Sequence, residues 1–180
     1  MNRREFCALP LILTGCGGSD MERVLQPSPR LVATKNMFEF GVRGNWTPSF
    51  TFGVPGDLSV SYTTQAGRFH RFGPFVYCNF TIYTSTFTHT TASGTALITG
   101  LPVTCVDDSL SPYLGTLRFR GITKAGFTQF IVAAEPNTNS LDIQASGSGL
   151  ADSFVIAADM PTGGTVSLMG SIWYLAKNIT

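Results

Sequence analysis

The stretch that decides the fold runs from Ser61 to Val103 and reads SYTTQAGRFHRFGPFVYCNFTIYTSTFTHTTASGTALITGLPV. It carries almost no charge, and apolar residues recur at every second position from Val76 to Ile82. Because successive side chains on a strand point to opposite faces, this period predicts a β-strand with one buried face. The dipeptide Gly73-Pro74 and the tripeptide Gly100-Leu101-Pro102 mark the turns that end such strands.

The same period of two continues on both sides of this stretch. It begins near Trp46 and recurs in short runs that end at residues 166–174, separated by glycine, proline and asparagine turns. No window of helical length shows a 3.6-residue apolar period. We therefore expect an all-β domain over residues 46–180, with nine or ten short strands in a two-sheet antiparallel sandwich of the jelly-roll type.

The length and composition of the chain limit the functions that it can have. The chain has 180 residues, of which 13% are charged, and its net charge is +1. That length suits one buried domain with an additional arm, and the small net charge gives no long-range attraction to nucleic acid. Low charge with many threonines and serines is typical of β-sheets whose neutral outer faces pack against copies of themselves.

No constellation in the sequence indicates catalysis. The chain contains no Gly-x-Ser-x-Gly elbow, no phosphate-binding loop and no zinc-ligand spacing. The two histidines, His70 and His89, are expected at the surface in hairpins. Asp107 and Asp108 are expected in a solvated loop, with a calcium ligand as the lesser alternative. We predict a non-enzymatic protein without cofactor or metal.

Residues 1–45 are predicted to form an anchoring arm and an extended linker, because they lack a sustained period and contain Pro27 and Pro29. The apolar residues that would dock the arm into a partner are Phe6, Leu9, Leu11, Ile12 and Leu13. The alternative is a twin-arginine lipoprotein signal, with Arg3-Arg4 before the apolar run and Cys16 as the lipidated residue. The apolar run is short for a signal and Pro10 interrupts it, so the arm is preferred.

Two cysteines, Cys78 and Cys105, lie in the predicted domain. A disulfide between them is one alternative. The preferred interpretation is that both are small buried hydrophobic residues, since no Cys-x-x-Cys pair or dense cysteine framework occurs.

Several short motifs follow one another between Trp46 and Val103. They are Trp46-Thr47-Pro48, Phe52-Gly53, Tyr62, Gln65-Ala66-Gly67-Arg68-Phe69, Gly73-Pro74-Phe75-Val76-Tyr77 and Gly100-Leu101-Pro102. In this order and approximate spacing they resemble a module found at the ends of phage tail fibres and other virion surface proteins. The resemblance covers about a third of the chain. Cys78 and the FHRFGPF segment depart from the module's usual pattern.

The resemblance implies a jelly-roll domain that assembles as a homotrimer on the virion of a tailed phage. It would be a short fibre or receptor-binding knob, held on a tail adaptor or on the capsid by the amino-terminal arm. Candidate residues for contact with host surface glycan are Tyr83, His89, Tyr113 and Asn137. Two alternatives stay open: a purely structural capsid decoration or tail-junction protein, and an exported bacterial lipoprotein with a jelly-roll binding domain. Neither nucleic acid nor a membrane span is expected.

Overall fold

The computed structural model describes residues 41–108 and 110–177, and the regular secondary structure of this part of the chain is almost entirely β-strand. The predicted all-β class is confirmed. The strands are β1 (Val42–Trp46), β2 (Ser49–Val54), β3 (Ser59–Phe72), β4 (Phe75–Thr88), β5 (Ser93–Thr99), β6 (Leu114–Arg120), β7 (Gln129–Ala134), β8 (Ser140–Ser146), β9 (Ser153–Phe154) and β10 (Ser167–Leu175). A single 3-10 turn, η1, covers Ala157–Asp159.

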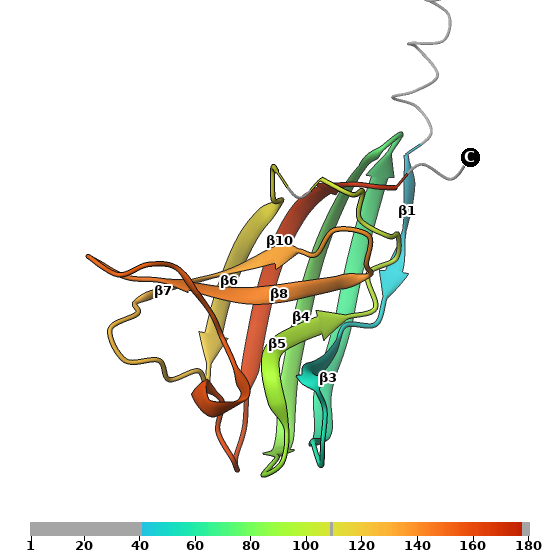
Figure 1. Cartoon of the computed structure of the whole chain (residues 1–180). Coiled ribbons are helices and arrows are strands. Elements are labelled where there is room, and N and C mark those ends of the chain that lie inside the picture. Colours follow the sequence, from blue (N-terminus) through green and yellow to red (C-terminus); the bar gives the residue numbers. More distant parts are fainter. Residues whose placement is uncertain (1–40, 109, 178–180) are drawn as a thin grey trace, which may run out of the picture. The chain divides into compact units, whose positions relative to one another are not determined.

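All ten strands belong to one antiparallel sheet with the order β1-β3-β4-β10-β6-β7-β8-β5-β2, and β9 adds to β8. The two strands at the ends of this order, β1 and β2, are separated in the chain by only Thr47 and Pro48. A flat sheet of this order could not bring its two edges so close. The sheet therefore curls strongly on itself, and Figure 1 shows β7 and β8 crossing in front of the long strands β10 and β4.

This architecture differs from the expected pair of separate sheets. Strand β6 pairs with β10 on one side and with β7 on the other, so the hydrogen-bonded ladder continues around the bend. The alternation of apolar residues reports which face of each strand is buried. It does not report whether neighbouring ladders are joined, and this is why the sequence did not distinguish one curled sheet from two stacked ones.

The inner face of the curled sheet encloses one hydrophobic core, to which both crossing layers contribute. Val76 and Ile172 enter it from the long strands, and Val132 and Ile143 enter it from β7 and β8. All four are no more than 1% exposed. The alternation predicted for β4 is confirmed, since Val76, Cys78, Phe80 and Ile82 are all buried.

One cross-strand row in this core alternates large and small residues. Trp46, Gly67, Phe80, Gly170 and Leu117 are register partners on β1, β3, β4, β10 and β6. The Trp46 ring lies over Gly67, and its indole N–H donates to the carbonyl oxygen of Asn79 at 3.1 Å. The Phe80 ring lies beside Gly170, where an added Cβ would come within 2.7 Å of it. Each glycine therefore provides the space that a neighbouring ring occupies.

Turns of the motif series are also explained by the structure. Gly100 has φ +94°, a conformation that side-chain-bearing residues rarely adopt. The amide nitrogens of Gly100 and Leu101 both donate to the carbonyl oxygen of Asn139, at 3.1 and 3.0 Å. This arrangement buries Leu101 directly after the turn. The Gly-Leu-Pro ending thus serves to reverse the chain and to close one end of the core.

Cys78 and Cys105 are both buried free thiols, as the preferred interpretation of the sequence predicted. Burial raises the pKa of Cys78 to about 12 and that of Cys105 to about 11, so both stay protonated at neutral pH. They act as small apolar residues of the core.

The described residues include part of the predicted linker, because β1 begins at Val42 and pairs with β3 along its whole length. The arm residues Phe6, Leu9, Leu11, Ile12 and Leu13, and the lipidation candidate Cys16, lie outside the described residues. Their roles stay predictions. Among the described residues, no helix is long and apolar enough to cross a membrane.

Replacing Gly170 by alanine tests the large–small row. An added Cβ would lie 2.4 Å from the backbone carbonyl oxygen of Thr116, which cannot move without disturbing β6. We expect Gly170→Ala to lower the free energy of unfolding by about 1–3 kcal/mol, as overpacking generally does. Urea titration followed by tryptophan fluorescence measures the change.

The matched control is Gly163→Ala, because nothing lies within 4 Å of the Cβ position at Gly163. This variant should unfold at the same urea concentration as the parent, to within the error of the measurement. If Gly170→Ala and Gly163→Ala unfold alike, the close packing of the row is not what holds the sheet in its curl.

Candidate functional site

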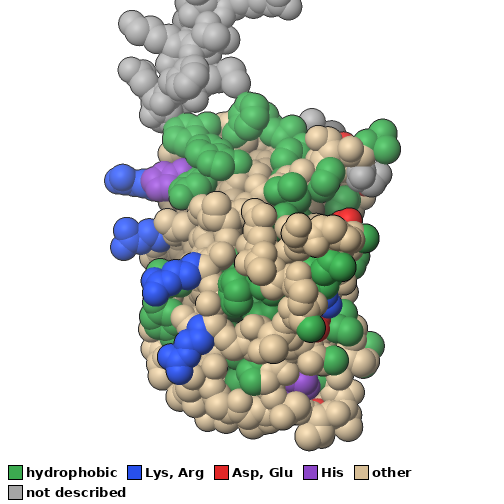
Figure 2. Space-filling view, turned by 90° about the vertical axis from the view of Figure 1, so that its left-hand side faces the viewer, with side chains coloured by type: hydrophobic (Ala, Val, Ile, Leu, Met, Phe, Trp, Pro, Cys, Tyr) green, Lys and Arg blue, Asp and Glu red, His purple; other side chains and the backbone are tan. Residues whose placement is uncertain are grey.

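Arginines gather on the outer face of the layer formed by β1, β3, β4, β10 and β6. These five strands contain Arg43, Arg68, Arg71, Arg118 and Arg120 and no aspartate or glutamate. Four of them, Arg43, Arg68, Arg118 and Arg120, are exposed, and we call the surface they mark the arginine face. Figure 2 shows basic side chains following one another down the left side of the domain, with no acidic side chain among them.

The register places these four arginines in successive cross-strand rows. Arg43 pairs with His70, Arg68 pairs with Asn79, and Arg118 and Arg120 pair with Met169 and Ser167 on β10. Neighbouring rows on one face of a sheet are two residues, or roughly 7 Å, apart along the strands. The arginines therefore follow a diagonal from β1 to β6, with one guanidinium per row.

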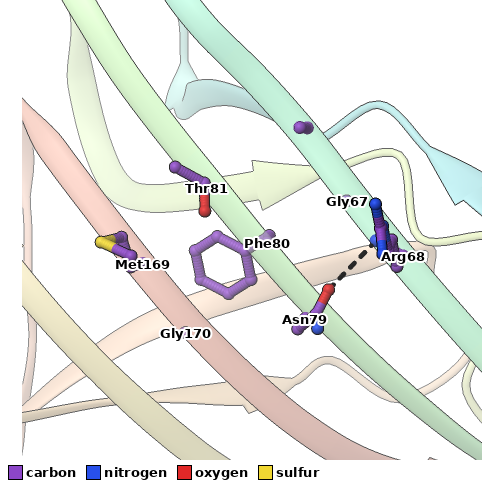
Figure 3. A pocket seen from close by; sticks show the side chains of 8 residues that line it. Gly67, Arg68, Asn79, Phe80, Thr81, Met169 and Gly170 are labelled. Atoms are coloured by element: carbon purple, nitrogen blue, oxygen red, sulfur yellow. Dashed lines mark hydrogen bonds between the residues drawn. The ribbon is translucent and has the colours of Figure 1, made fainter.

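Shallow hollows lie between the arginines. One, of about 380 Å3, is lined by Arg68, Asn79, Thr81 and Met169, with Gly67, Phe80 and Gly170 also among its lining. Figure 3 shows how β3, β4 and β10 each contribute side chains to it, and the dashed line marks the bond from the Arg68 amide to Asn79 Oδ1 at 3.2 Å.

Two further hollows continue the same surface. A hollow of about 400 Å3 is lined by Arg43, Asn45, Arg68 and His70, and one of about 430 Å3 is lined by Tyr83, Arg118, Arg120 and Ser167. Each hollow thus has at least one arginine at its wall. The remaining lining combines side chains that carry hydroxyl or amide groups with apolar residues and glycines. The surface offers hydrogen-bond donors and acceptors beside fixed positive charge.

An aromatic pair lies at one end of the arginine face. Tyr77 and Trp173 are register partners on β4 and β10, and their ring centroids are 4.7 Å apart. Trp173 is 57% exposed, which is high for the largest apolar side chain. Phe72 and Phe75, in the next row towards the β3–β4 turn, are also exposed. Tyr174, the next residue on β10, points to the opposite face and is buried in the core.

Charge in the domain is segregated. Within residues 41–108 and 110–177, all seven acidic residues lie off the five strands of the arginine face: Asp57, Asp107, Asp108, Glu135, Asp142, Asp152 and Asp159. The ion pair found in these residues joins Lys124 to Asp159 at 2.7 Å, away from the arginine face. No described carboxylate therefore neutralises the exposed arginines. The net charge of +1 conceals this separation, because it counts all charged residues of the chain together.

The structure does not bring the four glycan candidates together, and no hydrogen bond or ring contact within the described residues joins any two of them. Tyr83 is half-buried on the outer side of β4, and its hydroxyl lies 3.0 Å from Met169 Sδ. Since Tyr83 lines one hollow and Met169 another, Tyr83 belongs to the arginine face.

His89 differs from expectation, because it is buried with 5% of its surface exposed. Its ring stacks edge-on against Phe52 and Phe87, with centroid distances of 4.9 and 5.8 Å. Its Nε2 is buried without a hydrogen-bond partner among the described residues. The prediction of a surface position is wrong for His89: the chain turns inward after β4, and the imidazole completes an aromatic cluster. His70 is exposed, as predicted.

Tyr113 and Asn137 lie near loops rather than on the arginine face. Tyr113 packs against the core and donates to Asp108 Oδ2 at 3.3 Å; burial, with the Asp108 carboxylate, raises the pKa of its phenol. Asn137 occupies the turn between β7 and β8 with φ +59°, and its Oδ1 accepts from Lys177 Nζ at 2.7 Å. Both have structural partners, and a glycan contact by either stays a prediction.

The arginine face was not found from the sequence, although a signal for it existed. Arg68 and His70 are two positions apart on β3 and therefore point to the same face. On β6, Arg118 and Arg120 point to one face, and Leu117 and Phe119 point to the other. This alternation of polar and apolar residues identifies the three arginines as outward-facing. What the sequence did not contain was the strand order, which places β6 and β1 in one layer although some seventy residues separate them.

No cluster of three or more histidine, cysteine, aspartate or glutamate side chains suited to hold a metal occurs in residues 41–108 and 110–177. The arrangement present is a basic, partly aromatic surface with shallow hollows. Its chemistry is that of reversible binding to anionic or hydroxyl-rich groups.

Comparison with known proteins shows the fold but not a family. No family model and no curated protein matches the sequence. A solved structure with the same fold is the crystal structure of the Dettilon tailspike protein. The two superpose with a TM-score of 0.51 at 19% identity, over 75% of this chain and 24% of the tailspike chain. The chain thus shares a domain fold with about a quarter of that larger protein.

A buried carboxyl on β8 gives the domain a pH dependence. Asp142 on β8 is 7% exposed, and its Oδ1 accepts from Gln144 Nε2 at 3.1 Å. Burial raises the pKa of Asp142 to about 6, and nearby Glu135 adds to the increase. The folded state therefore takes up this proton more readily than the unfolded chain, so the contribution of Asp142 to stability grows as pH falls from about 6 to about 4.

Asp142→Asn should remove that contribution. We expect the variant to be more stable than the parent at pH 7, by up to about 3 kcal/mol, because each unit of pKa shift corresponds to 1.36 kcal/mol. The difference should shrink as pH approaches 4. Urea unfolding at several pH values measures it, with the exposed Asp152→Asn as the control. A parent and an Asp142→Asn variant that respond identically to pH would contradict the burial of an ionised carboxylate.

Proposed function

We propose that the chain is a structural or receptor-binding protein of a phage tail, exposed at the surface of the virion. The observation that carries this is the fold it shares with a phage tailspike over three quarters of its length. The motif series from Trp46 to Gly100-Leu101-Pro102 supports the same assignment, because Trp46, Gly67 and Gly100 have definite structural tasks in the domain. In this role the protein has no catalytic activity and presents a surface to the host.

The proposed assembly is a homotrimer, a short fibre or knob that the amino-terminal arm attaches to a tail adaptor or the capsid. The outer faces of β2 and β5 suit contacts between copies. Ser49 and Thr51 on β2, with Thr95 and Thr99 on β5, are neutral and half-buried. A neutral face can be covered by another copy without the desolvation cost that charged groups impose. The arginine face suits self-association poorly, since like charges would meet.

Labelling of virus particles tests the location. An antibody raised against the full chain, detected with gold in the electron microscope, should bind particles of the phage whose genome encodes the chain, at the tail. Labelling confined to the capsid would favour the decoration alternative instead. Particles without label, together with palmitate incorporation at Cys16, would overturn the proposal in favour of an exported lipoprotein.

Assembly is tested by introducing one charge into the proposed interface. Thr51→Arg places a guanidinium on the neutral face, so we expect it to convert the trimer into monomers in light scattering during gel filtration. Thr116→Arg adds the same charge to the exposed arginine face and should leave the trimer intact. A parent chain that is monomeric at all concentrations would reject the trimer. Dissociation of both variants would reject this choice of interface.

A further inference from the structure

We propose that the arginine face binds a linear polysaccharide that carries carboxylate groups. This inference rests on the proposed receptor-binding function and names the class of molecule that the surface would recognise. It assigns the contact to Arg43, Arg68, Arg118 and Arg120 on the sheet, with Trp173 at one end. Of the four residues that the sequence analysis named as glycan candidates, only Tyr83 borders the arginine face.

Charge is the first argument. Five arginines and no acidic residue lie on the five strands of this layer, and none of the five forms an ion pair with a described carboxylate. A guanidinium presents its donors in a planar fork that matches the two oxygens of a carboxylate. The face therefore has unused capacity for several carboxylates. A neutral glycan would leave that capacity unused.

Spacing is the second argument. One arginine occurs in each of four successive rows, and the strands between them hold the backbone rigidly. From Arg43 on β1 to Arg120 on β6 the diagonal crosses four strand intervals, or roughly 19 Å, and also advances three rows along the strands. Charges distributed over such a length suit an extended polymer better than a compact ion, which one or two arginines would suffice to hold.

The groups between the arginines are the third argument. Asn79 and Thr81 lie between β3 and β10, and the hydroxyls of Ser171 and Thr116 lie 3.1 Å apart between β10 and β6. Such side chains both donate and accept hydrogen bonds, as sugar hydroxyls require. The hollows of about 380–430 Å3 beside them provide room for individual sugar rings.

Trp173 provides the fourth argument. It is 57% exposed, and Tyr77 holds its ring from one side at a centroid distance of 4.7 Å. A fixed, exposed indole presents flat apolar surface with little loss of side-chain freedom on binding. The apolar face of a sugar ring is a suitable partner for it.

Other occupants of this face fit less well. A second copy of the chain would bring arginines against arginines. A single-stranded nucleic acid is bound by aromatic rings interleaved with the positive charges, so that successive bases stack. Here the exposed rings are confined to the end near Trp173. Among the rows of Arg68, Arg118 and Arg120 the one aromatic residue is the half-buried Tyr83, and the other polar or flexible members are serine, threonine, asparagine and methionine.

Binding of fluorescein-labelled polygalacturonate to the full chain, followed by fluorescence anisotropy, tests the inference. Each of Arg68→Gln and Arg118→Gln should weaken binding by about three- to tenfold, as for partly exposed charge-assisted contacts. Arg68→Lys should restore only part of the loss, because a lysine keeps the charge but not the fork. Trp173→Ala should weaken binding without changing its dependence on salt.

Lys177→Gln is the matched control, because it removes one exposed positive charge away from the arginine face. It should leave the affinity within about twofold, on the scale of a distant screened charge. The arm, with its own basic residues, is present in every variant and so does not affect the comparison. Circular dichroism and gel filtration confirm that each variant folds and assembles as the parent does.

Specific outcomes overturn the inference. Equal losses for Lys177→Gln and Arg118→Gln would show that net charge alone is responsible. Binding of neutral dextran as tightly as polygalacturonate would remove the role of carboxylates, and tighter binding of oligothymidylate would identify a nucleic-acid surface. Absence of polygalacturonate binding by a chain that labels phage tails would refute this inference alone. Binding by a chain that is absent from particles would instead refute the proposed function.

Discussion

The fold depends on one row of alternating large and small residues in the core. Trp46 covers Gly67, and Phe80 fills the space beside Gly170, so the strands β1, β3, β4, β10 and β6 can bend around the rings without a gap. If a side chain stood at either glycine, it would meet the indole or the backbone of the next strand at about 2.4 Å. Trp46, at one end of this row, is followed by only Thr47 and Pro48 before β2 begins, so the row ends at the connection between the two edge strands.

The same row shapes the outer surface. Gly67, Phe80 and Gly170 contribute to the lining of the hollow between Arg68 and Met169. These inward-facing residues leave backbone at the outer surface, and the outward-facing Arg68, Asn79 and Met169 border it. The positions of the arginines then follow from strand register, which the bend preserves. Core packing and the proposed binding surface thus use alternate residues of the same strands.

Much of this fold was predictable from sequence, and the limits have definite physical causes. The period of two correctly identified the strand that contains Val76 and Ile82, and Gly73 and Gly100 correctly marked turns. Periodicity is local, however, and the continuity of the ladder from β10 through β6 to β7 is a long-range property. His89 was misplaced for a related reason, since its burial against Phe52 comes from a strand more than thirty residues earlier.

The overall composition does not reveal the candidate site, because positive and negative charges lie on different parts of the domain. Within residues 41–108 and 110–177, seven acidic residues in the loops and second layer balance seven lysines and arginines, five of which lie on the strands of the first layer. An extended partner in contact with the first layer responds to the local field of the arginines, because at physiological ionic strength charges more than about 8 Å away are largely screened. A neutral protein can therefore present a strongly basic surface. For the same reason the proposed assembly and the proposed receptor contact use different layers of the sheet, since arginines that favour an anionic glycan disfavour a second copy of the same face.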